Sequence, residues 1–335
     1  MQKIDFVVRW VDSNDESWRK EKYSYQLLEK GKQRNEDEIG RIRYRDYDLM
    51  KYWFRGVEKY APWVNRVYFV TNGQKPKWLN EKCSKLQFVC HEEFIPKEWL
   101  PTFSSRTIDF NLYRIPNLSE QFVLFDDDMF LLNPTKPEDY FKNNLPCASK
   151  VYNAISARHN VSVSANVFHD MEIINKYFVK DSLLSKEGRK TLLKARYGVY
   201  LYKNIVLSLW HYYLGFQDFH LPASFLKSTF VQIWDKEYEL LCETCKNKFR
   251  KSSDVNQWLL QYWQLASNCF FPRTYKFGKC VELSDDLEDV QRLLHGKKYK
   301  TICINDAEVE DFNNTKKKLQ KMFENKFFEK SIFEN

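Results

Sequence analysis

Three consecutive carboxylates, Asp126, Asp127 and Asp128, directly follow the short apolar run Phe122–Phe125. Like charges repel, so carboxylates gathered at the end of a buried strand are costly without a cation. A hard, oxygen-ligated metal is the usual remedy, and Mg²⁺ or Mn²⁺ held by Asp127 and Asp128 would bind the diphosphate of a nucleotide sugar. A solvated acidic turn explains the triplet equally well, so this feature alone leaves both interpretations open.

Two further residues are candidates for moving a proton. Asp109 lies nineteen residues before Asp128, beside Arg106 at an expected helix start. It could act as a general base or as a second metal ligand, or simply be a first-turn acid favoured by the helix dipole. His220 precedes Leu-Pro at a break between expected helices, where a histidine more often ties down the backbone than performs catalysis.

Basic side chains elsewhere could hold phosphate oxygens. The planar fork of arginine matches phosphate geometry, although each such residue taken singly is more often a surface charge. The candidates are Arg43, Arg45, Arg106, His220, Lys227 and Arg250.

Alternating strands and helices must position these residues. Apolar, β-branched runs predict four strands, at 4–11, 67–70, 86–89 and 122–125. Helical spacing between them favours an α/β fold with a parallel, doubly wound sheet, in which ligands bind beyond the carboxyl ends of the strands. Asp12, Asn72 and the Asp triplet all fall at such ends. We therefore expect the site at this edge of the sheet.

After about residue 145 the sequence becomes helical and aromatic-rich. Helical segments are expected at 171–217 and 224–241 and from Ser253, a strand at 271–283, and an amphipathic helix at 316–328. The predicted domains are a nucleotide-sugar-binding α/β half (1–145), a helical insertion with the rest of the catalytic domain (146–312), and an amphipathic basic C-terminal helix (313–335).

Composition narrows the class of protein. The 335 residues carry a net charge of +8 and are 43% apolar, enough for a sizeable core. We expect a cytoplasmic chain, because no apolar run of about 18 residues marks a membrane span and Met1–Phe6 does not resemble a secretory signal. The eight irregularly spaced cysteines favour free thiols. The basic clusters match no nucleic-acid motif, so we expect no nucleic-acid partner.

Four blocks of the sequence resemble the Stealth family, which includes bacterial capsular polysaccharide phosphotransferases and the catalytic part of N-acetylglucosamine-1-phosphotransferase. The blocks cover 4–15, 43–130, 219–254 and 303–306. The second contains the strings KYAPWV, VTNGQ, PTFSS and FDDDMF in order, and the third is the loosest match. Some relatives have Asn-Asp-Asp where this chain has the Asp triplet, so the choice between Asp127 and Asp128 as metal ligand stays open.

The resemblance implies a Rossmann-like, mainly parallel sheet of the glycosyltransferase-A-like type with a helical C-terminal part. It also implies transfer of sugar-1-phosphate from a nucleotide diphosphate sugar, a UDP-sugar first of all, to a carbohydrate hydroxyl in capsule or cell-surface polysaccharide synthesis. This reaction forms a phosphodiester and releases nucleoside monophosphate.

In this scheme the metal-holding carboxylates are Asp127 and Asp128, and the acceptor proton would go to Asp109 or His220. The phosphate-holding residues would be Arg43, Lys227 and Arg250. The residues expected against the nucleoside, sugar or phosphates are Asp12, Arg43, Asn72, Arg106, Asn305 and Asp306.

Two other functions stay open. A conventional glycosyltransferase, releasing nucleoside diphosphate, would use the same fold and carboxylates, and a non-catalytic carbohydrate-binding module would use the aromatic residues for stacking.

A lipid-linked oligosaccharide acceptor would require peripheral contact with the inner face of the membrane. The apolar stripe Leu319, Met322, Phe323 and Phe327, flanked by lysines, would provide that contact, unless it packs on the core of the protein itself.

Overall fold

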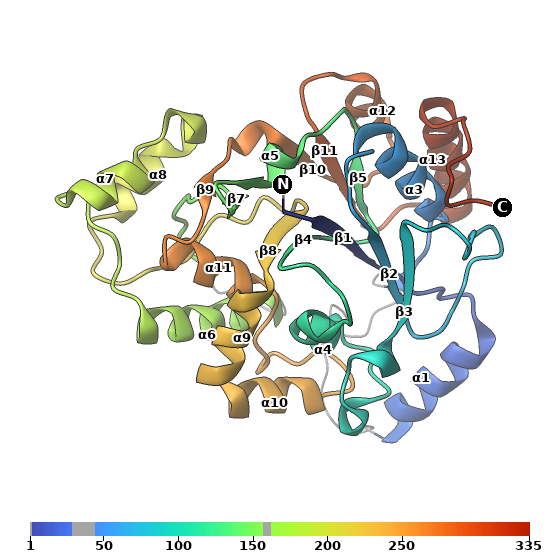
Figure 1. Cartoon of the computed structure of the whole chain (residues 1–335), viewed down its shortest axis with the longest axis horizontal. Helices are drawn as coiled ribbons and strands as arrows, with labels where there is room; N and C mark the ends of the chain where they lie inside the picture. Colours follow the sequence, from blue (N-terminus) through green and yellow to red (C-terminus); the bar gives the residue numbers. More distant parts are fainter. Residues whose placement is uncertain (1, 29–43, 157–161) are drawn as a thin grey trace.

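The computed structural model describes residues 2–28, 44–156 and 162–335. At its centre lies a five-stranded sheet in the order β3-β2-β1-β4-β8 (Figure 1). Its first four strands in the chain are parallel, and β8 pairs antiparallel with β4 at one edge. The strands are β1 (Ile4–Arg9), β2 (Val67–Thr71), β3 (Leu86–Cys90), β4 (Gln121–Phe125) and β8 (Ala223–Leu226).

Two apolar cores lie on the two faces of this sheet, because side chains alternate along each strand. Phe6 and Val8 of β1 belong to one core and Val7 to the other. The first core is covered by α3 (Met50–Tyr60), α12 (Glu288–His295) and α13 (Phe312–Lys326). The second is covered by α4 (Ser105–Asn111), α6 (Ser162–Tyr177), α9 (Lys227–Lys236), α10 (Tyr238–Lys246) and α11 (Trp258–Ala266).

Two small sheets flank the central one. The first joins β10 (Gly278–Glu282), β11 (Thr301–Asn305) and β5 (Met129–Leu131), and the second joins β6 (Phe141–Lys142), β7 (Leu145–Ala148) and β9 (Phe271–Pro272). Because β5 follows the Asp triplet directly and pairs with β11, residues near 305 lie beside residues near 128. The other α-helices are α1 (Glu16–Leu28), α5 (Pro137–Tyr140), α7 (Lys186–Leu192) and α8 (Leu201–Leu207).

The predicted fold class is confirmed: an α/β protein with a parallel-rich central sheet and a helical, aromatic-rich C-terminal part. The expected helix at 224–241 is wrong at its start, since β8 occupies Ala223–Leu226 and covers the edge of β4 before α9 begins. The expected strand at 271–283 is broken by a 3-10 turn at Tyr275–Phe277. The three-part division at residues 145 and 312 stays a prediction.

The apolar stripe of the C-terminal helix packs on the core, which is the second of the two alternatives that the sequence leaves open. Leu319, Phe323 and Phe327 of α13 are buried in the first core. The ring of Phe323 lies 4.7 Å from that of Phe130, centroid to centroid. A search of the described residues finds no helix long and apolar enough to cross a membrane.

Candidate active site

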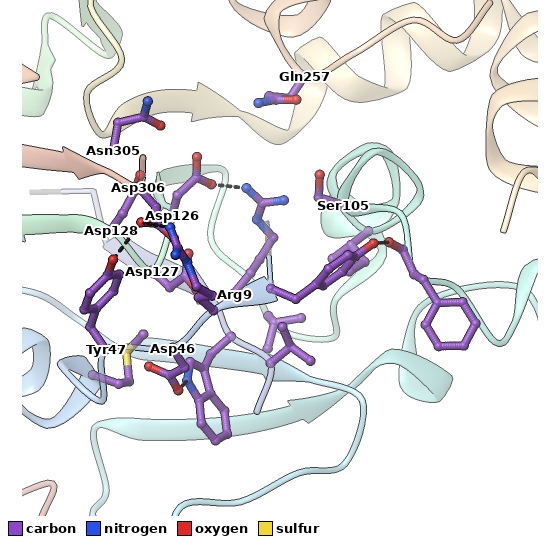
Figure 2. Close-up of a pocket in the computed structure, with 18 of the residues that line it drawn as sticks. Arg9, Asp46, Tyr47, Ser105, Asp126, Asp127, Asp128, Gln257, Asn305 and Asp306 are labelled. Atoms are coloured by element: carbon purple, nitrogen blue, oxygen red, sulfur yellow. Dashed lines mark hydrogen bonds and ion pairs between the residues drawn. The ribbon is translucent and has the colours of Figure 1, made fainter. Parts of the chain in front are cut away.

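A cavity of about 930 Å³ opens at the carboxyl ends of β1, β2 and β4, where the strand pattern predicts the site (Figure 2). Its wall combines the end of β1, the loop before α3, the start of α4, the Asp triplet, the segment before α11 and the end of β11. Among the residues predicted from sequence, those that line it are Arg45, Asn72, Arg106, Asp127, Asp128, His220, Arg250, Asn305 and Asp306.

The Asp triplet forms the turn between β4 and β5. Asp126 is ion-paired with Arg9, which makes the turn less negative. The side chain of Asp127 is exposed and lines the cavity. Restricted access to bulk water, together with the charges of Asp128 and Asp46, raises its pKa to about 7. A second negative charge at this turn is therefore costly unless a cation accompanies it.

Asp128 carries a buried oxygen that lacks a hydrogen-bond donor. Its Oδ2 accepts from the thiol of Cys303 at 3.2 Å, whereas its Oδ1 has no partner among the described residues. Ligand atoms of Asp128, Cys303 and His220 lie within 4.8 Å of one another. Burial raises the pKa of Asp128, against the opposing effect of His220. A buried, unpaired carboxylate oxygen beside Asp127 fits a divalent cation, for which oxygen ligands of this kind are typical.

His220 is placed at the cavity wall by the strand that follows it. Its backbone has a positive φ of 48°, and its N–H donates to Asp218 Oδ1 at 2.8 Å. Its ring Nδ1 lies 3.4 Å from the other oxygen of Asp218. Burial alone would lower the pKa of His220, but the hydrogen bond and charge of Asp218, with the charge of Asp128, raise it to about 9. Asp218 thus orients the ring and favours its protonated form.

Asp109 is not among the residues that line the cavity, which favours the structural alternative for this residue over a base or metal ligand. It is fully buried, and Arg9 Nη1 donates to its Oδ2 at 3.0 Å. Burial raises its pKa to about 7, although Arg9 and Arg106 act in the opposite direction. Because Arg9 also pairs with Asp126 and lines the cavity, Asp109 positions Arg9 rather than touching a ligand.

Arg106 and Arg250 both line the cavity but differ in how many donors remain for a ligand. The buried guanidinium of Arg106 donates to Asp254 at 2.6 Å and to Asn166 at 2.5 Å, which ties α4 to α6. Its role is thus to hold the cavity wall together. Arg250 Nη2 donates to the hydroxyl of Ser105 at the rim.

Two other predicted residues, Lys227 and Asp12, lie away from the cavity. Lys227 lies at the amino end of β4, opposite the end at which the cavity opens, because antiparallel β8 finishes beside the first residues of β4. Its Nζ donates to the carbonyl of Leu118. Asp12 follows β1 as expected, but its carboxylate accepts from the backbone N–H of Asn14 at 2.8 Å in its own turn. Arg43 lies outside the described residues.

Asp306 is held in place by two residues from the loop before α3. Arg45 donates through Nε and Nη2 to the two oxygens of Asp306 at 2.9 and 2.8 Å, and the hydroxyl of Tyr47 donates to Oδ1 at 2.7 Å. Arg45, a predicted phosphate-holding candidate, therefore orients a carboxylate instead. The pair joins residues 261 positions apart, which sequence spacing does not reveal.

Sequence reasoning missed Arg9 and His91 as parts of the site. Arg9 ends an otherwise buried strand, and a lone charge at that position was a usable signal. His91 lines the cavity beside it, and burial with the charge of Arg9 lowers its pKa to about 3, so the ring is neutral. Nothing in the spacing of His91 distinguishes it from a core histidine.

The Arg9 ion pairs yield a test of this arrangement. Arg9→Gln leaves Asp109 buried without its cation, and we expect a loss of about 3–5 kcal/mol in the free energy of unfolding near pH 8. Lowering the pH should reduce the loss, because Asp109 can then take up a proton and become neutral. Denaturant unfolding at several pH values measures both effects.

The double variant Arg9→Gln/Asp109→Asn should recover part of the loss, since it leaves no buried unpaired carboxylate at position 109. As a control, Lys75→Gln breaks the exposed pair with Glu81 and should leave the free energy of unfolding almost unchanged. A double variant that is less stable than Arg9→Gln alone would contradict the assignment.

Comparison with known proteins gives matches over the whole chain. The family model for Stealth protein CR2, conserved region 2, matches residues 43–148. The capsular polysaccharide phosphotransferase WcwK of Streptococcus pneumoniae is 45% identical, covering 100% of this chain and 98% of the relative. The exopolysaccharide phosphotransferase cps2G of Lactiplantibacillus plantarum is 40% identical, covering 99% and 96%. The receptor polysaccharide phosphotransferase WefC of Streptococcus oralis is 39% identical, covering 92% and 91%.

These full-length identities agree with the family model and with the sequence resemblance. The model's matched region contains α4, β4 and the Asp triplet, and thus much of the cavity wall. The chain belongs to the Stealth family.

Proposed function

We propose that this protein transfers sugar-1-phosphate from a nucleotide diphosphate sugar to a hydroxyl of a polysaccharide acceptor. The relatives' names support phosphotransfer in capsular and exopolysaccharide synthesis. The observation that carries the proposal is the unpaired oxygen of Asp128 beside His220, in a cavity at the carboxyl ends of the strands. This arrangement combines a place for a phosphate-bound cation with a place for a proton acceptor.

In the proposed reaction, the acceptor oxygen forms a bond to the β-phosphorus of the donor. The bond from that phosphorus to the oxygen bridging to the α-phosphorus breaks, and nucleoside monophosphate leaves. Asp127 and Asp128 would hold Mg²⁺ or Mn²⁺, which when bound neutralises charge on the diphosphate oxygens. Arg250, Asn72 and Asn305 line the cavity and would contact the donor.

His220 is the proposed general base. Asp218 accepts at the Nδ1 side of its ring, which leaves Nε2 to receive the acceptor proton. His220 must be neutral to do so, whereas Asp218 and Asp128 together favour its protonated form. A cation bound to Asp128 would remove one of these two influences and lower the pKa of His220. Binding of the metal-bound donor would therefore favour the neutral ring, which can accept a proton.

The released nucleotide tests the proposal directly. Protein incubated with a panel of nucleotide sugars, UDP-sugars first, and a carbohydrate acceptor should yield nucleoside monophosphate and a sugar product that contains phosphorus. Phosphorus NMR identifies both, because a phosphodiester and a free nucleotide have distinct resonances. Release of nucleoside diphosphate with a plain glycoside would instead establish a conventional glycosyltransferase.

The role of His220 can be separated from that of Asp109 by substitution. His220→Ala should lower kcat by about 10²–10⁴-fold and remove the limb of the pH profile that rises as the ring loses its proton. Asp109→Asn should keep this limb, because Asp109 positions Arg9 without reaching the cavity. His295→Ala, on the exposed end of α12, serves as the control. A His220→Ala enzyme with an unchanged pH profile would exclude His220 as the base.

A further inference from the structure

Exposed apolar side chains gather on the lobe formed by α7 and α8. Of the eighteen large apolar residues exposed among the described parts of the chain, ten fall within 179–212. Figure 1 places α7 and α8 at the outer edge of the molecule, on the side opposite α13. Most soluble proteins scatter such residues singly, so a concentration of this kind marks an interaction surface.

The outward side of α8 is apolar along its whole length. Tyr202, Ile205 and Val206 lie on one helix face because they are three and four residues apart, and Leu209 continues this spacing in the turn just after α8. Leu209 is 82% exposed and Tyr202 60% exposed. We call this set, with Val199 before it and Trp210 after it, the α8 face.

Polar contacts attach the opposite side of α8 to the rest of the protein. The orientation of the helix, with its apolar side facing solvent, is therefore fixed. Asn204 is fully buried, and its amide donates to the carbonyls of Lys150 at 3.0 Å and Leu192 at 2.9 Å. The side-chain oxygen of Asn204 accepts from the backbone N–H of Tyr152 at 2.7 Å. The ammonium of Lys180 donates to the carbonyl of Leu207 at 2.6 Å, at the end of the helix. These contacts hold the apolar side toward solvent.

The same segment is strongly basic. Within 179–212, seven lysines and arginines accompany only two acidic residues, Asp181 and Glu187. Tyr and Trp side chains beside leucine and isoleucine suit the boundary between lipid head groups and acyl chains, and the basic residues suit anionic head groups. An anionic partner suits this basic segment better than a second copy of the chain, whose own basic segment would repel it.

We propose that the α8 face docks the protein on an anionic lipid bilayer, with α8 lying in the plane of the surface. The chain leaves α8 at Leu207 and runs through residues 208–219 to His220, so this single segment joins the docked lobe to the cavity wall. The further step, that the docked enzyme meets a lipid-linked acceptor there, rests on the proposed function.

Vesicle flotation with the full chain tests the docking itself, without donor or acceptor. Wild-type protein should float with vesicles of phosphatidylcholine containing about 30% phosphatidylglycerol, bind vesicles of phosphatidylcholine alone far less, and be released by salt. Leu209→Glu should reduce the bound fraction about tenfold or more, because a charge replaces an inserted side chain. Lys186→Gln/Lys190→Gln should weaken binding and reduce its dependence on salt.

Phe328→Glu is the matched control. Phe328 is 65% exposed beyond the end of α13, so this variant introduces the same charge at an exposed apolar site away from the α8 face. It should bind vesicles as wild type does. Each variant replaces exposed side chains, and an unchanged melting temperature would confirm that it is folded.

Equal binding of Leu209→Glu and wild type, or no binding by wild type, would overturn the proposal. So would self-association of wild type, seen by analytical ultracentrifugation and abolished by Leu209→Glu, since the α8 face would then be a subunit interface. Activity on a soluble acceptor separates the two proposals: vesicle binding without sugar-1-phosphate transfer would refute the proposed function and leave the docking intact.

Discussion

Carboxylates crowded at the end of β4 are the constraint on which the rest of the site depends. Asp126, Asp127 and Asp128 follow a fully buried strand, where charges are poorly solvated. The single guanidinium of Arg9 pairs with both Asp126 and the buried Asp109. Among the described residues, no cation pairs with Asp127 or with the buried Oδ1 of Asp128. The proposed metal site rests on these unpaired carboxylate oxygens.

Elements distant in sequence converge on this turn and complete the site. Strand β11 pairs with β5, and the backbone N–H of Ile304 donates to the carbonyl of Asp128 at 2.9 Å. This brings Asn305 and Asp306 to the cavity and the thiol of Cys303 to Asp128. Strand β8 runs antiparallel to β4, so the start of β8 lies at the carboxyl end of β4. His220, just before β8, therefore lies at that end as well. Two strand pairings therefore bring His220 and the carboxylates together.

Sequence reasoning succeeded where the signal was local. The apolar runs of β1 to β4 and the Asp triplet were visible directly, and their common edge in a parallel sheet predicted the cavity. It failed for Lys227, because the direction of β8 depends on a pairing with β4 that no residue spacing encodes. It left the role of Asp109 open because a buried carboxylate with its own arginine has the same sequence signature as a catalytic one. The stripe on α13 was ambiguous for a similar reason, since amphipathic spacing does not say what covers it.

Manganese binding measured by electron paramagnetic resonance tests the central claim, that Asp128 with Asp127 holds a divalent cation. Titration of wild-type protein with Mn²⁺, alone and with a nucleotide diphosphate sugar, should remove the signal of free Mn²⁺ through a single site. Asp128→Asn should weaken this binding about tenfold or more, as expected for loss of a charged ligand, whereas Glu329→Gln at an exposed position should leave it unchanged. Equal Mn²⁺ binding by Asp128→Asn and wild type would contradict the account.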